Sequence, residues 1–175
     1  LSSPPYEGGV DAASADGVVL SRPSKLKDFY LGYKQLAKEP HEIITSIRFK
    51  KPSGDFRFNF EKVSKRTYLD IASVNTAISL ECSPPYEGGV DAASADGLVL
   101  SAAHVSAGGV SPIPLYLKET SAFLAGRDIS EETINTANEI MQAEISPISD
   151  VRGSAEYKRL LLRQLFRAHF VQALT

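Results

Sequence analysis

In two stretches of this chain apolar and polar residues alternate with a period of two. This alternation constrains the fold more than any other feature of the sequence. Phe56, Phe58 and Phe60 alternate with polar residues, which predicts a half-buried strand over 56–64. Residues 71–81 show the same period and predict a second strand. Strands joined by short local connections form antiparallel sheets. The centre of the chain therefore predicts an antiparallel sheet.

Further β runs flank these two strands. Residues 17–21, 42–50 and 98–110 are each rich in apolar side chains, and 98–110 ends in two glycines. Residues 51–55 read Lys-Pro-Ser-Gly-Asp, which is turn chemistry. We therefore expect 42–50 and 56–64 to form a hairpin.

The pattern becomes helical after the prolines near position 113. A first helix is predicted over 115–124, a second begins after Ser130 and ends before Pro147, and a third begins at Ser154. Two apolar stripes are possible on the third helix. One holds Tyr157, Leu161, Leu165, Ala168 and Val171, and the other holds Leu162, Phe166 and Phe170. The predicted fold is an α+β sandwich, in which a sheet of three to four antiparallel strands packs against three helices.

Composition describes an ordinary globular protein of one domain, with or without an appendage. The chain has 175 residues, 43% of them hydrophobic, and a net charge of −2. This charge gives no reason to expect a nucleic-acid partner, and no apolar run has the length that spans a membrane. A cytoplasmic location is the default expectation. The first residue is Leu1, which suggests a fragment or a processed product.

The sequence predicts no metal site of its own. Cys82 is the single cysteine, so no disulfide can form within the chain and no thiolate cluster can hold zinc or iron–sulfur. The histidines, His41, His104 and His169, are far apart in the sequence and lack further ligands at metal-binding spacing.

A long segment occurs twice. Residues 3–21 and 83–101 differ only at Val18 and Leu98. Its Pro-Pro, Gly-Gly and Ala-Ser-Ala runs are typical of a flexible surface loop. A recent duplication, an artefact and a partner-recognition loop are all open interpretations.

A compact group of charges lies at the end of the first strand and just after it. Lys62, Lys65, Arg66 and Asp70 fall within nine positions, where the alternation of 56–64 ends. Such a group could stabilise a pyrophosphate or the electron-rich edge of a reduced flavin, because charge-assisted hydrogen bonds are the stronger kind. A solvated strand end is the alternative interpretation.

The remaining polar clusters predict structure rather than chemistry. Gly108 and Gly109 indicate a turn, since no phosphate-binding glycine motif follows. Asp150 and Arg152 predict a local ion pair, and Ser154 predicts a helix cap. No residue lies in a nucleophile motif, and no carboxylate pair stands in a recognisable motif. We therefore expect no catalytic residue in the chain.

Several motifs, in this order, resemble a known family. They are residues 28–34, 42–47, 106–114, 124–126 and 148–159, together with the run Lys62-x-x-x-Arg66-x-x-x-Asp70. This arrangement resembles the C-terminal domain of the FAD-binding subunit of molybdenum hydroxylases. The family includes xanthine dehydrogenases and carbon monoxide dehydrogenases, and the resemblance is nearest to the small subunit of bacterial xanthine dehydrogenases.

The resemblance implies how the chain is organised and what surrounds it. Residues 1–26 would be a linker and strand from the end of a preceding FAD-binding domain, and 27–175 the C-terminal domain, with the repeated loop at 83–97. FAD would be shared with the preceding domain, while the molybdenum cofactor and [2Fe–2S] clusters would lie elsewhere in the complex. The partners would be the FAD-binding and iron–sulfur domains of the same subunit and a molybdenum-binding large subunit, with NAD as electron acceptor.

The resemblance also implies which residues meet the cofactor. Lys62 matches a lysine that touches FAD, and Ile44 or Thr45 matches an apolar contact from the first strand of the domain. Arg66 and Asp70 would lie beside the isoalloxazine ring. The complex would hydroxylate a purine-type heterocycle, and this fragment alone would be inactive. Two alternatives stand beside this one: a carbon monoxide dehydrogenase-type medium subunit, and a cofactor-free interaction or dimerisation module.

Overall fold

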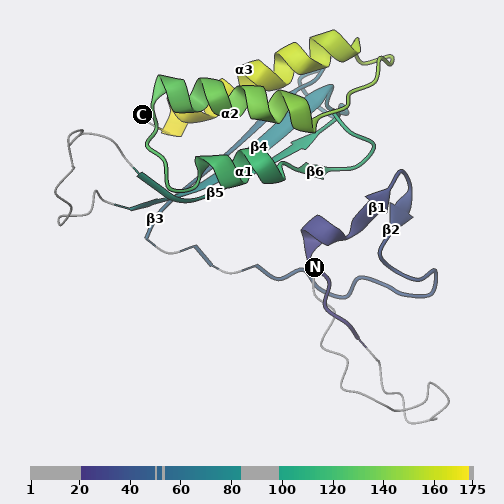
Figure 1. Ribbon diagram of the computed structural model, residues 1–175. Helices are drawn as coiled ribbons and strands as arrows, with labels where there is room; N and C mark the ends of the chain where they lie inside the picture. Colours follow the sequence, from purple (N-terminus) through teal and green to yellow (C-terminus); the bar gives the residue numbers. More distant parts are fainter. Residues whose placement is uncertain (1–20, 50, 53, 84–98, 174–175) are drawn as a thin grey trace. The chain divides into compact units, whose positions relative to one another are not determined.

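The structure, a computed structural model, describes residues 21–49, 51–52, 54–83 and 99–173. The chain divides into two compact units, and the boundary falls between Lys51 and Pro52. Figure 1 shows the elements of both units. The predicted strand over 17–21 and the two copies of the repeated segment lie largely outside the described residues.

The first unit contains a short 3-10 helix and a small hairpin. The helix η1 spans Leu26–Asp28, and strands β1 (Tyr30–Gly32) and β2 (Gln35–Leu36) pair in antiparallel fashion. Lys34 lies in the turn between the two strands with a φ of 58°, in the left-handed region. Phe29 is the buried aromatic residue at the entry to this hairpin.

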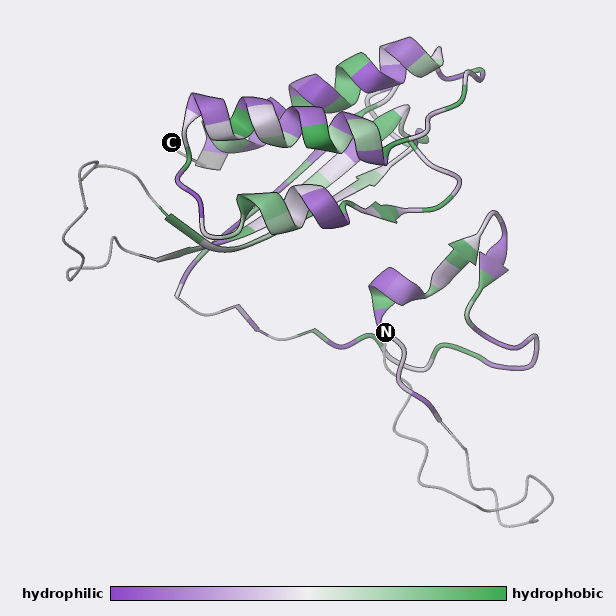
Figure 2. Cartoon of the chain, in the orientation of Figure 1, coloured by the Kyte–Doolittle hydropathy of each residue, from purple (hydrophilic) through white to green (hydrophobic). Residues whose placement is uncertain are grey.

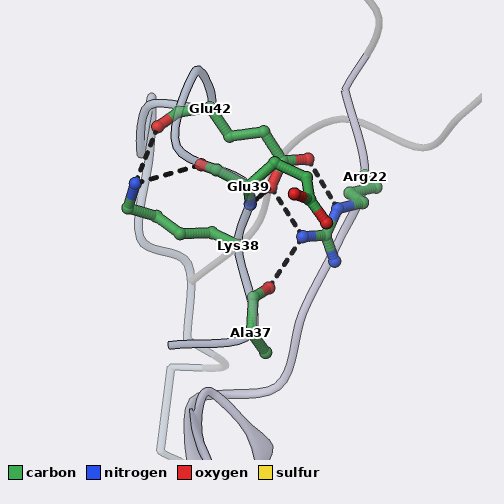
Figure 3. Close-up of polar contacts among 5 residues, drawn as sticks. All are labelled: Arg22, Ala37, Lys38, Glu39 and Glu42. Atoms are coloured by element: carbon green, nitrogen blue, oxygen red, sulfur yellow. Dashed lines mark hydrogen bonds and ion pairs between the residues drawn. The ribbon is translucent and has the colours of Figure 1, made fainter. Parts of the chain in front are cut away.

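An ion pair closes the segment that contains the hairpin (Figure 3). The Arg22 guanidinium donates to both carboxylate oxygens of Glu42, at 2.7 Å each, and to the carbonyl oxygen of Ala37. The backbone N–H of Glu39 also donates to Glu42, and the Lys38 ammonium donates to the Glu42 carbonyl. The hydrogen bond from Arg22, followed by that from Glu39, lowers the pKa of Glu42 to about 2. The two ends of the segment are thus held by a bidentate contact.

The predicted strand over 42–50 is wrong for the residues described, because 42–49 contain no strand. The predicted hairpin with 56–64 is wrong as well, since that strand pairs with a later one. A β pattern becomes a strand only when a neighbour supplies hydrogen bonds, and the described part of the chain pairs no strand with this segment. Ile43, Ile47 and Phe49 remain exposed.

The second unit contains a four-stranded antiparallel sheet. The strands are β3 (Asp55–Val63), β4 (Val74–Ser83), β5 (Val99–Gly108) and β6 (Leu115–Tyr116), adjacent in that order. The predicted strands over 56–64, 71–81 and 98–110 are confirmed. Strand β6 occupies the start of the predicted helix over 115–124, because Leu115 and Tyr116 pair with β5.

Three helices cover one face of this sheet (Figure 1). They are α1 (Lys118–Leu124), α2 (Glu131–Glu144) and α3 (Ala155–Ala173). The hydroxyls of Ser130 and Ser154 accept hydrogen bonds from the first turns of α2 and α3, as the sequence predicts. Gly126 follows α1 with a φ of 80°. The α+β sandwich is confirmed.

Apolar stripes of the helices meet the sheet in one core. Figure 2 shows hydrophobic and hydrophilic bands alternating along α2 and α3. On α3 the stripe of Leu162, Phe166 and Phe170 is buried, whereas Tyr157 and Val171 are exposed. The second of the two predicted stripes therefore supplies the fully buried side chains, while Leu161 and Leu165 of the first pack against the core and are partly buried. Each such side chain contributes roughly 1.5–3 kcal/mol by leaving water.

Strand β3 has its apolar face on the side away from the helices. Residues directly opposite in an antiparallel pair share a face, and Asn59 lies opposite Ile78, which is buried in the core. Phe58 and Phe60 point the other way and are 63% and 52% exposed. The strand is thus confirmed, but its alternation does not place the phenylalanines in the core.

A buried histidine explains why the inner face of β3 is polar. His169 of α3 is fully buried, and the Asn59 side-chain amide donates to its Nδ1 over 2.9 Å. An apolar side chain at Asn59 would leave this nitrogen without the hydrogen bond that a buried polar atom needs. Burial lowers the pKa of His169 to about 4, although the charge of Glu61 acts in the opposite direction.

Candidate functional site

The end of β3 holds the lysine that the sequence pattern singles out. Lys62 is exposed, and its ammonium donates to the carbonyl oxygen of Asp70 over 2.7 Å. The backbone N–H of Ser73 donates to the Val63 carbonyl and closes the turn where β4 begins. A charge carried at the end of a rigid strand is held in a defined position. The side chain of Lys62 is therefore fixed against the turn that joins β3 to β4.

Asp70 organises this turn. Its carboxylate accepts the backbone N–H of Arg66 at 2.9 Å and that of Ile71 at 3.0 Å, and lies 3.6 Å from the Arg66 guanidinium. These contacts, led by the Arg66 backbone N–H, lower the pKa of Asp70. Leu69 has a φ of 49° inside the turn, a conformation that the Asp70 hydrogen bonds hold in place. The Arg66 side chain itself remains 72% exposed.

The connection between α2 and α3 is tied to the same turn. The Lys65 ammonium donates to the Val151 carbonyl over 2.7 Å, and the Ser73 hydroxyl donates to the Arg152 carbonyl over 3.0 Å. The sequence pattern indicated a structural role for residues 150–154 and did not place them near Lys62. Only the tertiary fold brings Lys65 and Val151, 86 positions apart along the chain, into contact.

Gly109 brings the β5–β6 connection to this end of the sheet. It has a φ of 82°, and a Cβ atom there would lie 2.4 Å from the carbonyl oxygen of Ser73. Glycine is therefore required on both conformational and steric grounds. The predicted turn at Gly108 and Gly109 is consistent with this geometry. Three connections consequently meet at the end of β3.

Lys158 is a residue of this region that the sequence reasoning missed. Its ammonium lies 2.8 Å from the Asp150 carboxylate and donates to the Ile148 carbonyl, and the side chain is almost fully buried. The predicted partner of Asp150, Arg152, is farther away at 4.0 Å. The hydrogen bond from Lys158 is the main cause that lowers the pKa of Asp150. The sequence held a signal that Lys158 is buried. It precedes Leu162 by four positions and therefore lies on the same face of α3 as the buried stripe.

Ile44 and Thr45 lie in the other compact unit. Both are exposed and belong to no strand. The structure groups Lys62, Arg66 and Asp70, and the contact expected of Ile44 or Thr45 stays a prediction.

The charges at the end of β3 suit an electron-rich ligand. The ammonium groups of Lys62 and Lys65 both donate to backbone carbonyls rather than to carboxylates, so these contacts do not neutralise them. A lysine ammonium has three donors, and the contact of Lys62 with the Asp70 carbonyl uses one of them. The residues present therefore fit a group that offers phosphate or carbonyl oxygens.

The described part of the chain contains neither a cluster of metal ligands nor a membrane-spanning helix. Within it, no group of three or more His, Cys, Asp or Glu side chains could hold a metal ion. No helix within the described ranges is long and apolar enough to cross a membrane.

Two known proteins are similar to this chain in sequence. The carbon monoxide dehydrogenase medium chain of Afipia carboxidovorans is 29% identical over 141 residues, which cover 81% of this chain and 44% of that protein. Xanthine dehydrogenase 1 of Arabidopsis thaliana is 27% identical over 161 residues, which cover 90% of this chain and 11% of that protein. The chain thus spans less than half the length of the medium chain and about a tenth of the plant enzyme.

Solved structures give the same picture. A reconstituted CO dehydrogenase from Oligotropha carboxidovorans matches with a TM-score of 0.75 and 26% identity, covering 88% of this chain and 49% of the matched chain. The family model for the CO dehydrogenase flavoprotein C-terminal domain matches residues 60–173. This match includes β4, β5, all three helices, and the turn with Lys62, Arg66 and Asp70. The chain therefore belongs to the family of CO dehydrogenase flavoprotein C-terminal domains.

Proposed function

We propose that this chain closes one side of the FAD site in the flavoprotein subunit of a molybdenum hydroxylase. The observation that carries the proposal is Lys62, an exposed ammonium fixed at the end of β3 within the region that the family model matches. Residues 27–175 form the C-terminal domain in this proposal, and 1–26 connect it to a preceding FAD-binding domain.

Each residue of the site has a part in this proposal. Lys62 donates a charge-assisted hydrogen bond to the flavin, and the exposed Arg66 guanidinium adds positive charge beside the ring. Asp70 holds the turn that carries Arg66 and is a positioning residue. Ile44 or Thr45 supplies an apolar contact. Bound FAD supplies the electron transfer itself, and these side chains stabilise the negative charge of its reduced form.

The complex around this domain is part of the proposal. It hydroxylates a purine-type heterocycle in the cytoplasm, and electrons pass from a molybdenum centre through [2Fe–2S] clusters to FAD and then to NAD. A preceding FAD-binding domain, an iron–sulfur domain and a molybdenum-binding large subunit are the partners. The match to a plant xanthine dehydrogenase over 90% of this chain supports this substrate class.

A carbon monoxide dehydrogenase-type medium subunit is the second candidate. Its support is the 29% identity to the medium chain from Afipia carboxidovorans, a protein of which the match covers 44%. Anaerobic addition of xanthine or of carbon monoxide to the assembled complex separates the two. Bleaching of flavin absorbance by xanthine alone supports the first candidate, and bleaching by carbon monoxide alone supports the second.

Replacing Lys62 tests the flavin contact. In the full-length subunit we expect Lys62→Gln to lose FAD at least tenfold faster, because the neutral amide loses the charge-assisted bond. The measurement is flavin fluorescence after dilution of the loaded protein. Lys118→Gln removes an exposed lysine from the first turn of α1 and serves as the matched control.

The same experiment can contradict the proposal. Equal FAD retention in the Lys62 variant and in the control would remove Lys62 from the site. A full-length protein that never takes up FAD would favour the third alternative, a cofactor-free interaction module.

A further inference from the structure

The sheet face that points away from the helices is the feature that the proposed site leaves unexplained. We call it the outer face and define it by seven side chains on four strands. They are Phe58 and Phe60 on β3, Ala77 and Ser79 on β4, His104 and Ser106 on β5, and Tyr116 on β6.

The strand register arranges these side chains in two rows across the sheet. Phe58 lies opposite Ser79, which lies opposite His104. Phe60 lies opposite Ala77, which lies opposite Ser106, and this second row ends at Tyr116. The outer face therefore has aromatic rings along both margins and small side chains between them.

The residues along both margins of the outer face are held in place by contacts within the sheet. His104 Nδ1 and the Tyr116 hydroxyl lie 2.8 Å apart, and their ring centroids are separated by 6.0 Å. On the opposite margin, Phe58 and Phe60 are carried by a nine-residue strand fully paired with β4.

Exposed aromatic side chains on the second face are unusual for a sheet covered on one side. Such antiparallel sheets place apolar residues toward the core and polar residues toward water. Strand β3 does the reverse, since Asn59 and Glu61 face the helices while Phe58 and Phe60 are more than half exposed. Contiguous exposed apolar side chains mark interaction surfaces. The arrangement favours a partner that covers the outer face.

The outer face is continuous with the proposed flavin site. Lys62 follows Phe60 by two positions and therefore lies on the same face of β3. At the tip of the adjoining turn, Tyr68, Leu69 and Ile71 are strongly exposed, with Leu69 at 97%. Apolar exposure thus extends from the aromatic margin past Lys62 to the tip of the turn.

The length of the relatives indicates what covers this surface. The matched region is 44% of the medium chain from Afipia carboxidovorans and 49% of the solved Oligotropha chain, so about half of each protein lies outside the match. We infer that the outer face is the docking surface for the flavin-carrying part of the same subunit. This inference rests on the proposed function, because a ligand brought to Lys62 by another domain places that domain beside Phe60.

Cysteine labelling tests whether the outer face is covered. Cys82, the one cysteine of the sequence, is buried, so it contributes little background reaction. We expect Ser79→Cys to react with a small maleimide in the 175-residue chain, and at least tenfold more slowly in the full-length subunit. Glu139→Cys on the exposed side of α2 is the control, with equal rates expected in both proteins.

A second cysteine probe controls for a local effect of the Ser79→Cys substitution. Ser106→Cys lies in the same row as Phe60 and Tyr116 and should show the same protection. Protection should persist after FAD is removed, since the docked domain rather than the cofactor covers the face. This result keeps the inference separate from the proposed function, which fails when the full-length protein does not bind FAD.

Each remaining outcome overturns the inference. Equal labelling of both probes in the short and full-length proteins would show an uncovered face. Protection in the 175-residue chain that grows with protein concentration would assign the face to a second copy. Protection there at every concentration would assign it to another segment of this chain. Loss of protection on removal of FAD would assign the cover to the cofactor.

Discussion

The two faces of the sheet differ in whether their apolar side chains are buried. On the inner face, Val74, Ile78 and Leu80 of β4 are fully buried against the helices, as a period of two residues predicts. On the outer face, Phe58 and Phe60 have the same period and remain exposed. A period of two shows that a segment is a strand, but it does not show which face lies toward the core. A strand whose apolar face turns away from the core indicates a second surface to be covered.

The largest effect is expected from the inner face. Phe166 is fully buried, and Phe166→Ala should lower the free energy of unfolding of the 175-residue chain by about 3–5 kcal/mol, since it leaves a cavity in the core. Urea denaturation followed by circular dichroism measures this change. Leu160→Ala on the exposed side of α3 is the control and should change stability by less than about 0.5 kcal/mol.

The buried histidine should make the inner face sensitive to acid. His169 has its pKa lowered to about 4 in the folded chain, so the unfolded chain binds a proton first as the pH falls below 6.5. Stability is therefore full above pH 6.5 and is lost progressively down to about pH 4. The total loss is up to about 3 kcal/mol, because lowering a pKa by one on folding is worth about 1.4 kcal/mol.

Urea midpoints at several pH values measure this loss. His169→Gln should remove the dependence between pH 6.5 and 5, above the range in which the lowered pKa values of Glu42, Asp70 and Asp150 contribute. His104→Gln, on the exposed side of β5, should retain it. An unchanged pH dependence in the His169 variant would show that other groups cause the acid sensitivity.

The smallest effect on stability is expected from the outer face. Phe58→Thr should change the free energy of unfolding of the 175-residue chain by no more than about 0.5 kcal/mol, because the ring is mostly exposed and threonine suits a strand. A loss comparable to that of Phe166→Ala would abolish the difference between the two faces. It would show that Phe58 belongs to the core of this chain.

Much of the second unit could be predicted from local patterns. The periods of β3, β4 and β5, the caps at Ser130 and Ser154, and the apolar stripe ending at Phe170 each depend on residues close together in the sequence. Helix and strand preferences act over such short distances. The resemblance built on these segments also agreed with the family to which the chain belongs.

The predictions failed for segments whose secondary structure depends on a pairing partner that is distant in the sequence. The β pattern over 42–50 has no strand beside it in the described chain, so 42–49 remain irregular despite a favourable composition. Residues 115–116 pair with β5 instead of beginning a helix. In both places a hydrogen-bonding neighbour, or its absence, overrides local preference.

The candidate site also has features that the local sequence determines and contacts that depend on the tertiary fold. Sequence alone determined that Lys62 lies at the end of a strand and that Arg66 and Asp70 follow it, because spacing and strand period are local properties. Tertiary structure alone decided that Lys65 reaches the Val151 carbonyl, that Lys158 pairs with Asp150, and that the phenylalanines of β3 face away from the helices. These contacts join residues that only the folded sheet and helices bring together, and the Asn59 contact with His169 across the core favours the polar face of β3 as the buried one.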